Sequence, residues 1–263
     1  MTVFVLGPEA TFSHELAIRL REDDIRLVPT IGRIFEQVVH GEGDGIVPIE
    51  NSEAGGVGAT LDGLVRHPVF ITAEMYMPID HYLAAQVPEQ EIIRVFVHPQ
   101  TAEQCSELLE RLGVPVVQTG SNAQSAIELG KDPAAGAIIP SYAVAHYRLP
   151  VIAEHVQNSP DNVTRFIRIA SRSAAPKENG KCSIVIDPAA DRTGLLHDLL
   201  AVFAVKKINL NRIESRPSKR GIGNYVFFLD YEMSEGYRDA ITYLKTMTDV
   251  KELGCYTKVG VPD

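Results

Sequence analysis

The residue run best suited to acid–base chemistry is Asp161-Asn-Val-Thr-Arg-Phe166. It brings an amide (Asn162), a hydroxyl (Thr164) and a cation (Arg165) within four residues. A guanidinium can hold a carboxylate through two hydrogen bonds while a neighbouring hydroxyl handles a proton. The same residues could instead form an exposed loop with a surface arginine, and their spacing leaves both interpretations open.

A second polar run, Glu50-Asn51-Ser52, follows the apolar residues 45–49 and precedes two glycines. A carboxylate, an amide and a hydroxyl in succession offer donors and acceptors to a polyoxygenated small molecule. The glycines let the backbone approach a ligand closely. The alternative, of equal weight, is an Asx-type turn before a helix that begins near Val57.

Two further loops carry polar groups. In Gly7-Pro-Glu-Ala-Thr-Phe-Ser13, the hydroxyls of Thr11 and Ser13 stand at the start of a helical pattern, where an anion can bind; an ordinary helix cap is the alternative. The loop lacks the lysine of a phosphate-binding Gly-x-x-x-x-Gly-Lys motif. In the loop before residue 101, His98 fits a plain loop histidine better than a general base, and Gln100 is the stronger candidate.

These loops are placed by alternating elements. Short apolar runs that predict strands alternate with amphipathic patterns that predict helices throughout residues 1–170. Such alternation indicates an α/β sheet covered by helices. Functional loops in these sheets lie beyond the carboxyl ends of strands, which is where the polar loops after Leu6, Ile49 and Val97 stand.

The alternation of predicted strands and helices changes near residues 171–180, a polar stretch of linker composition. The net charge is −10 before residue 181 and +1 after it. The later elements read strand, helix, strand, strand, helix, strand, at residues 182–186, 195–205, 210–216, 225–231, 237–247 and 250–259. This order predicts a ferredoxin-like βαββαβ unit, which we expect to be compact and separate from the first domain.

Composition limits the function classes. The chain has 263 residues, enough for two domains, and its net charge of −9 argues against non-specific binding to nucleic acid or to an anionic membrane. No apolar segment is long enough to span a membrane, and the first residues do not resemble a signal peptide, so we expect a cytoplasmic protein. Cys105, Cys182 and Cys255 are widely spaced, which favours reduced, buried thiols and no metal site.

The C-terminal unit has two runs that could hold an amino acid. Gly194 precedes a helical pattern, and Asn209 follows that helix at the start of the next strand. A helix start can receive a carboxylate, and an amide can bind a polar end. By themselves, the two runs are more simply explained as a helix start and a charged strand.

Taken in order, the motifs resemble those of the prephenate dehydratase family with a C-terminal ACT regulatory domain. The similar segments extend over nearly the whole chain: Gly7-Pro-x-x-Thr-Phe-Ser13, Pro48-Ile-Glu-Asn-Ser52, His98-Pro-Gln100 with Gln104-Cys105, Asp161-Asn-x-Thr-Arg-Phe166, Gly194-x-Leu-His197 and Glu214-Ser-Arg-Pro217.

The resemblance implies two α/β lobes similar to type II periplasmic binding proteins, with the active site in the cleft between them. The catalytic domain would cover residues 1–176, with lobe 1 at about 1–79 and 148–176 and lobe 2 at about 80–147. The ACT domain would cover residues 181–263.

The implied reaction converts prephenate to phenylpyruvate, carbon dioxide and water without a cofactor or metal. The resemblance implies catalytic roles for Thr164, Glu50 and Asn51, and substrate binding by Thr11, Ser13, Ser52, Gln100, Asn162, Arg165 and Phe166. Thr164 would assist departure of the hydroxyl and Arg165 would anchor a carboxylate. Arogenate dehydratase, or a non-catalytic amino-acid sensor, is the alternative.

The ACT domain implies allosteric control by L-phenylalanine and self-association as a homodimer or homotetramer. The effector would lie between subunits, against Gly194, Leu195, Leu196, His197, Asn209, Leu210, Glu214, Ser215 and Arg216.

Overall fold

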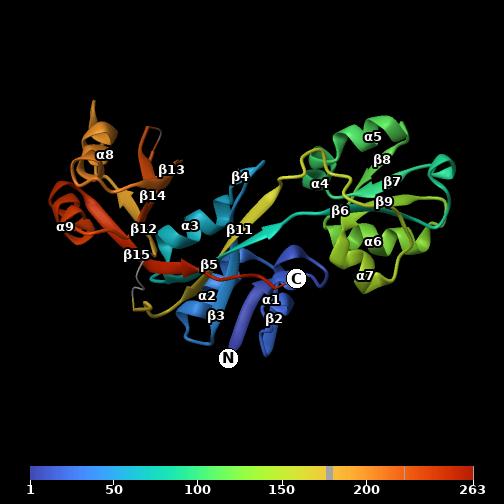
Figure 1. The fold of residues 1–263 in the computed structure, drawn as a ribbon, viewed down its shortest axis with the longest axis horizontal. Coiled ribbons are helices and arrows are strands. Elements are labelled where there is room, and N and C mark those ends of the chain that lie inside the picture. Colours follow the sequence, from blue (N-terminus) through green and yellow to red (C-terminus); the bar gives the residue numbers. More distant parts are fainter. Residues whose placement is uncertain (176–179, 222, 263) are drawn as a thin grey trace.

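The computed structural model describes residues 1–175, 180–221 and 223–262. Residues 176 and 263, where the two expected domains end, lie outside this range. The molecule is an elongated row of three units, with the N-terminal lobe in the middle (Figure 1). No helix in the described part of the chain has the length and apolar character needed to cross a membrane.

The central first lobe is built on strands of the larger sheet. Its first strand is apolar and buried, and Thr11 caps the helix that follows by accepting a hydrogen bond from the His14 amide. Thr30 caps the second helix in the same way. The elements are β1 (Thr2–Leu6), α1 (Phe12–Arg19), β2 (Asp24–Val28), α2 (Ile31–Val39), β3 (Asp44–Asn51), β4 (Gly55–Gly56), α3 (Gly58–Arg66), β5 (Phe70–Pro78) and β11 (Val163–Ala170).

The second lobe has its own five-stranded sheet, in the order β10-β6-β9-β7-β8. Its elements are β6 (His81–Ala85), the 3₁₀ turn η1 (Glu89–Glu91), β7 (Val95–Val97), α4 (Pro99–Gln104), α5 (Ser106–Leu112), β8 (Val116–Gln118), α6 (Asn122–Lys131), β9 (Gly136–Pro140), α7 (Ser141–Tyr147) and β10 (Val151–Ala153).

The second lobe extends further along the chain than we expected. Strand β10 pairs with β6, so the chain returns to the first lobe after Ala153 and not near residue 147. The reason is local, because the apolar Val151-Ile-Ala153 run reaches an open edge of β6. Nothing in its composition distinguishes it from a strand of the first lobe.

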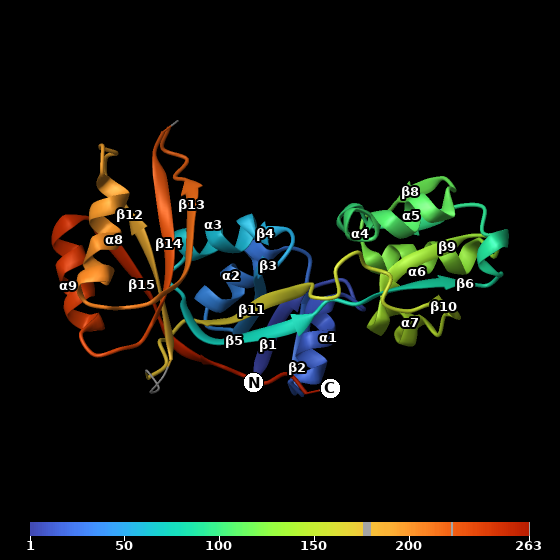
Figure 2. The same ribbon diagram turned by 45° about the horizontal axis from the view of Figure 1, so that its top comes forward.

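The C-terminal unit has the expected βαββαβ order. Its elements are β12 (Lys181–Asp187), α8 (Leu195–Val205), β13 (Leu210–Pro217), β14 (Tyr225–Glu232), α9 (Tyr237–Met247) and β15 (Asp249–Lys258). Helices α8 and α9 cover the face of this sheet that points away from the first lobe (Figure 2). The expected class, a two-lobed α/β region followed by a ferredoxin-like unit, is therefore confirmed.

The C-terminal unit is not separate from the first lobe, in contrast to our expectation. Strand β15 pairs with β5, which joins both units in one ten-stranded sheet. A single apolar cluster contains Phe35 and Leu61 of the first lobe together with Val185, Phe228 and Tyr256 of the C-terminal unit. A sheet face not covered by α8 and α9 is apolar and has to be buried against another layer. The first lobe provides that layer.

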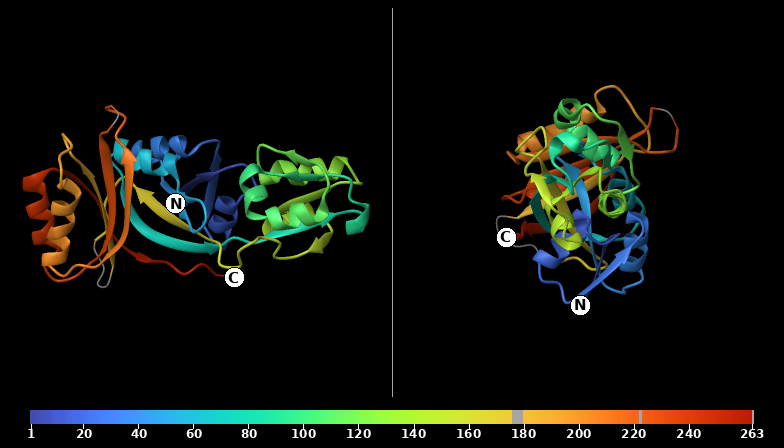
Figure 3. Two further views of the ribbon diagram at one scale, coloured as in Figure 1. Left: turned by 90° about the horizontal axis from the view of Figure 1, so that it is seen from above. Right: turned by 90° about the vertical axis from the view of Figure 1, so that its right-hand side faces the viewer.

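Beyond β15, the chain runs back along the first lobe (Figure 3). There Val261 packs against the apolar cluster that contains Val3, Val5 and Leu16. The C-terminal unit and the segment that follows it are thus both attached to the first lobe.

The cysteines also differ from expectation. Cys182 and Cys255 form a disulfide, while Cys105 is free and buried. The two residues are 73 positions apart in the sequence, but they lie directly opposite each other on β12 and β15. Sequence spacing could not show this pairing, because it depends on strand register.

Candidate active site

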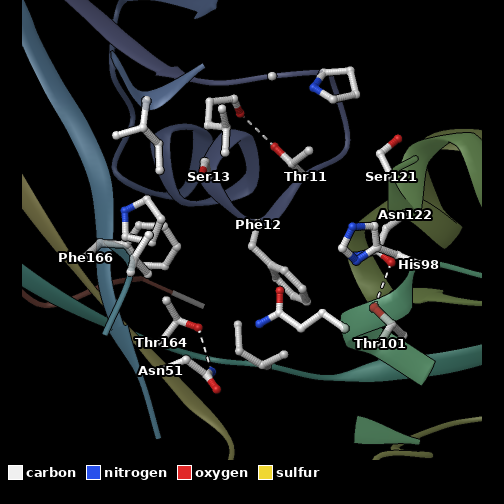
Figure 4. Close-up of a pocket in the computed structure, with 18 of the residues that line it drawn as sticks. Thr11, Phe12, Ser13, Asn51, His98, Thr101, Ser121, Asn122, Thr164 and Phe166 are labelled. Atoms are coloured by element: carbon white, nitrogen blue, oxygen red, sulfur yellow. Dashed lines mark hydrogen bonds between the residues drawn. The ribbon is translucent and has the colours of Figure 1, made fainter. Parts of the chain in front are cut away.

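A cavity of about 520 Å³ lies where the first and second lobes meet. The first lobe contributes the loop before α1, the start of α1, and parts of β3 and β11, and the second lobe contributes the starts of α4 and α6 (Figure 4). The residues with polar side chains in its lining are Thr11, Ser13, Asn51, His81, His98, Gln100, Thr101, Gln104, Ser121, Asn122 and Thr164.

Six of the ten residues that we expected at the active site line this cavity. They are Thr11, Ser13, Asn51, Gln100, Thr164 and Phe166. They come from four separate stretches of sequence. The fold brings these four stretches around one space.

The most informative contact joins β3 to β11. The amide nitrogen Nδ2 of Asn51 donates a hydrogen bond to Oγ1 of Thr164, at 3.0 Å (Figure 4). The two residues are direct partners in the antiparallel register of these strands. Thr164 is 9% exposed, so its hydroxyl is held at the cavity wall and largely shielded from bulk water.

The orientation of the Asn51 amide follows from its other bonds. Its Oδ1 accepts the backbone N–H groups of Glu53 and Ala54, and its Nδ2 also donates to Asn162 Oδ1, at 2.7 Å. Because two backbone donors require an oxygen, the nitrogen must point to Thr164. Asn51 thus forms the expected Asx-type turn, and its side chain also lines the cavity. A ligand-binding role for the run Glu50-Asn51-Ser52 stays a prediction.

Helix α1 of the first lobe and helix α6 of the second lobe both begin at the cavity with a side-chain cap. Helix α1 is capped by Thr11, whose hydroxyl also donates to the carbonyl of Leu6, and helix α6 is capped by Ser121. The N-terminal end of a helix carries a partial positive charge. Both ends favour a negatively charged ligand between the lobes.

The cavity lining is otherwise uncharged. Among the described residues, no Lys, Arg, Asp or Glu lines it. Burial lowers the pKa of His81 to about 4, and burial also lowers the pKa of His98, so both rings are predominantly neutral at pH 7. An anion would therefore meet neutral donors and helix ends rather than side-chain cations.

The other four expected residues lie outside the cavity lining. Ser52 and Asn162 support the strand ends, because Ser52 Oγ accepts the Val163 amide and Asn162 accepts from Asn51. Glu50 and Arg165 point to the other side of the sheet, toward the C-terminal unit.

Arg165 is positioned differently from our expectation that it anchors a substrate carboxylate. Its side chain is 2% exposed, and its guanidinium contacts Glu50, Glu74, Asp230 and the hydroxyl of Tyr256. Burial opposes the charge, but Asp230, Tyr256 and Glu74 outweigh burial and raise the pKa of Arg165. Successive side chains of a strand alternate in direction, so a residue next to Thr164 faces away from the cavity.

The expected effector residues lie in two places. Gly194, Leu195, Leu196 and His197 begin α8, with the His197 side chain 86% exposed. Asn209 precedes β13 and donates to Glu232 Oε1 at 2.8 Å. On β13, Leu210 packs on the core of the C-terminal unit, and Ser215 is exposed. Two other residues of β13 contact the first lobe: Glu214 lies over Gly56, and Arg216 lies near Asp62.

Several lining residues were missed in the sequence. Ser121 and Asn122 follow β8 in the run Thr119-Gly-Ser-Asn122, where Ser121 caps α6. The rule that we applied to the other loops, a polar cap after a strand, would have selected them. Phe12, whose ring contacts that of His81 edge-on across the two lobes, carried no such signal, because apolar residues are usually assigned to the core.

Comparisons with known proteins agree along the chain. A family model described as prephenate dehydratase matches residues 3–174, and an ACT domain model matches residues 184–241. A prephenate dehydratase of Bacillus subtilis is 30% identical over 98% of this chain and 97% of its own length. A bifunctional chorismate mutase/prephenate dehydratase of Aquifex aeolicus is 35% identical over 98% of this chain and 72% of its own length.

The structural comparison agrees with the sequence comparison. The crystal structure of a prephenate dehydratase from Arthrobacter aurescens, in complex with L-Phe, matches with a TM-score of 0.90 at 31% identity. The match covers 98% of this chain and 90% of that one. The chain spans 65% of the length of two further bifunctional relatives.

Proposed function

Because the chain belongs to the prephenate dehydratase family, whose members are carbon–oxygen lyases, and also carries an ACT domain, we propose that it converts prephenate to phenylpyruvate under the control of L-phenylalanine. We assign catalysis to the two lobes, up to about residue 175, and regulation to the unit that begins at residue 181. The chorismate mutase activity of the bifunctional relatives is not part of this proposal.

The chemistry needs charge placement more than bond-forming side chains. The ring carboxylate leaves as carbon dioxide, its electron pair moves into the ring, and the 4-hydroxyl leaves from the opposite position. The departing hydroxide takes up one proton and becomes water, so the overall reaction consumes one proton. Aromatisation drives the reaction, and the protein has to orient a dianion and stabilise the leaving oxygen.

The observation that carries the proposal is the Asn51–Thr164 hydrogen bond at the cavity wall. Because Oγ1 of Thr164 accepts from Asn51, the hydroxyl proton of Thr164 is available to the leaving oxygen. The bond also stabilises negative charge that develops on Oγ1 as that proton is shared. Thr164 is therefore the proposed donor, and Asn51 polarises it.

The two carboxylates of prephenate are assigned to the two helix starts. Thr11 and Ser13 of α1 lie on the first-lobe side of the cavity, and Ser121 and Asn122 of α6 lie on the second-lobe side. A ligand with two anionic groups can bind to both helix starts at once. Such binding requires the start of α1 in the first lobe to face the start of α6 in the second lobe. Neutral donors suit the ring carboxylate in particular, because this group gives up its negative charge when it leaves as carbon dioxide.

Regulation is proposed to occur between copies of the ACT domain. Strand β13 ends the ten-stranded sheet, so one of its edges has no neighbour within the described chain. Such an edge commonly pairs with another copy, which supports a homodimer or homotetramer. Gly194–His197 and Asn209–Leu210 would then bind phenylalanine between subunits. The relative from Arthrobacter aurescens was crystallised with L-Phe.

A kinetic experiment tests the proposal directly. The purified protein is incubated with prephenate or with arogenate, each with and without phenylalanine, and phenylpyruvate or phenylalanine formation is followed. Preferred turnover of arogenate would identify the aminated substrate, and no turnover of either would leave an amino-acid sensor. Mass measurement in solution tests the oligomer, since a monomer that responds fully to phenylalanine contradicts an effector site between subunits.

A further inference from the structure

Strands β3 and β11 carry two pairs of facing residues, one on each side of the sheet. Thr164 pairs with Asn51 and points to the cavity, while Arg165 pairs with Glu50 and points to the ACT domain. The two pairs are consecutive along both strands. A displacement of Arg165 or Glu50 therefore acts on the backbone that holds Thr164 and Asn51.

Arg165 makes its contacts with both domains at once. From the ACT domain, Asp230 of β14 accepts from its Nη1 at 2.5 Å, and the Tyr256 hydroxyl of β15 accepts from its Nη2 at 2.9 Å. From the catalytic domain, Glu74 of β5 accepts from its Nε at 2.8 Å, and Glu50 accepts from Nη1 at 3.0 Å.

Glu50 is held from the ACT side as well. Its Oε2 is 2.6 Å from Nε of Arg212 on β13, and Arg212 in turn contacts Glu214. The Arg212 side chain is 9% exposed. Both members of the Arg165–Glu50 pair are thus bound to ACT strands.

When the ACT strands move, the charged groups of this cluster cannot simply lose a contact and become hydrated. Arg165, Glu74 and Asp230 are each 6% exposed or less at the side chain, so water cannot replace a lost partner. A buried charge that loses its partner is strongly disfavoured. A shift of β13 or β14 relative to the catalytic domain therefore has to move Arg165 and Glu50, or else has to overcome that penalty.

The cluster also adjoins the proposed effector residues. Arg212 stands on β13 between Leu210 and Glu214. A ligand that repositions β13 thus acts first on Arg212, then on Glu50, and then on the strand pair that carries Asn51 and Thr164.

We propose that a buried cluster couples the ACT domain to the active site, and that phenylalanine changes turnover by shifting this cluster. The cluster consists of Arg165, Glu50, Glu74, Asp230, Tyr256 and Arg212. The proposal rests on the proposed function. It makes Arg165 a positioning residue that acts through Thr164 and does not contact the substrate. Coupling of this kind requires phenylalanine to bind more tightly to one of the two arrangements.

The first test compares two variants on the ACT side with a matched control. Asp230→Asn removes one charge from the cluster at nearly constant shape, and Tyr256→Phe removes only a hydroxyl. Lys219→Gln is the control, because Lys219 contacts Asp62 across the same domain boundary but does not touch the cluster. Turnover of prephenate is measured with and without saturating phenylalanine, and phenylalanine binding is measured by calorimetry.

We expect the Kd of each cluster variant for phenylalanine to stay within about threefold of the wild-type value. The absolute value of the logarithm of the ratio of turnover with phenylalanine to turnover without it should fall to half of the wild-type value or less. Lys219→Gln should keep the wild-type ratio. Unchanged ratios in both cluster variants would overturn the coupling role.

The second test needs no effector. Hydrogen–deuterium exchange at residues 50–52 and 163–165 should be faster in Asp230→Asn than in wild type and unchanged in Lys219→Gln. Equal exchange in all three proteins would refute the coupling, whatever phenylalanine does. If wild type turns over prephenate but neither binds nor responds to phenylalanine, the proposed regulation fails, and the exchange result alone decides whether the domains are coupled.

Discussion

Asn51 determines the direction in which the Thr164 hydroxyl can donate its proton, because Oγ1 accepts a hydrogen bond from Asn51 Nδ2. Its Oδ1 is taken by the amides of Glu53 and Ala54, so its Nδ2 has to donate to the Thr164 hydroxyl. A free threonine hydroxyl is a very weak acid, and the donated hydrogen bond is what makes its proton easier to share. We therefore propose a catalytic pair, Asn51 and Thr164, rather than a single threonine.

Replacing Thr164 tests the donor itself. Thr164→Ala should lower kcat by roughly 10²-fold or more with little change in KM, because the hydroxyl acts mainly in the transition state. Thr164→Ser is the matched control and should stay within about tenfold of wild type, since it keeps the hydroxyl. Steady-state kinetics on folded protein decide the matter, and a near-normal kcat for the alanine variant would remove Thr164 from the mechanism.

Changing Asn51 tests the polarity of the pair. Asn51→Asp keeps an oxygen for the Glu53 and Ala54 amides but places an acceptor where the donor was. The Thr164 hydroxyl would then donate to the introduced carboxylate instead of the substrate, and kcat should fall by roughly 10²-fold. Kinetics together with circular dichroism would check this result. A folded variant with wild-type kcat would mean that the direction of this hydrogen bond is immaterial.

The burial of His81 should make the free energy of unfolding depend on pH. Its side chain is buried and its Nε2 bonds to Gln104, and burial lowers its pKa from 6.5 to about 4. Between these values the unfolded chain binds a proton that the folded chain does not, so the folded state loses stability as the pH falls from about 6.5 to 4. Below about pH 4 this loss is complete.

The size of the His81 effect can be measured by difference. Between pH 7.5 and 4.5, this residue should remove about 2–3 kcal/mol from the free energy of unfolding. Urea unfolding at both values, for wild type and for His81→Gln, isolates the contribution because all other groups are shared. Parallel pH profiles for the two proteins would contradict the assignment.

At the scale of elements, the junction of β15 with β5 holds the ACT domain to the first lobe. At this junction Gly254 has φ +110°, and a Cβ there would lie 2.9 Å from the carbonyl oxygen of Ile71 on β5. The pairing of β15 with β12 shifts register next to this glycine. Gly254 thus permits β15 to approach β5 closely, three residues before Thr257 pairs with that strand.

Gly254→Ala should accordingly destabilise the protein by roughly 1–3 kcal/mol, through the unfavourable φ and the close backbone contact. Gly130→Ala is the control, because a Cβ there meets nothing within 4 Å and Gly130 lies in helix α6. Alanine is favoured over glycine in a helix by ~1 kcal/mol, so this variant should be as stable as wild type or more so. Thermal unfolding of both variants makes the comparison, and equal midpoints would argue against strain at Gly254.

At the scale of the whole molecule, the three units share more than a linker. The larger sheet continues from the ACT domain into the first lobe, and the apolar cluster of α2 and α3 is completed by ACT side chains. The second lobe, in contrast, joins the first lobe at the end opposite the ACT domain (Figure 1). The cavity is lined by residues of these two lobes. The first lobe therefore connects the regulatory sheet to the cavity.

Removal of the ACT domain tests this arrangement. A chain that ends at residue 175 keeps every residue of the cavity lining, but loses Val185, Phe228 and Tyr256 from the shared cluster and exposes the edge of β5. We expect it to unfold at a lower temperature than the full chain, to be active below that temperature, and to be insensitive to phenylalanine. An unchanged unfolding temperature would mean that the shared cluster contributes no stability.

Much of this organisation is contained in local sequence. The strand–helix alternation, the helix caps at Thr11 and Thr30, and the βαββαβ order follow from periodicity and capping chemistry, which depend on near neighbours in the chain. The polar loops at strand ends could be selected as candidate site residues for the same reason. Five of those polar candidates, Thr11, Ser13, Asn51, Gln100 and Thr164, line one cavity.

Tertiary structure decided where each side chain points and what it meets. Arg165 and Thr164 are adjacent in sequence, yet they face opposite sides of a sheet and contact different domains. The disulfide between Cys182 and Cys255, and the pairing of β10 with β6, are likewise matters of register between strands that are distant in the chain. Strand direction and register arise from the burial of whole faces, a property of the packed layers that no single stretch of sequence contains.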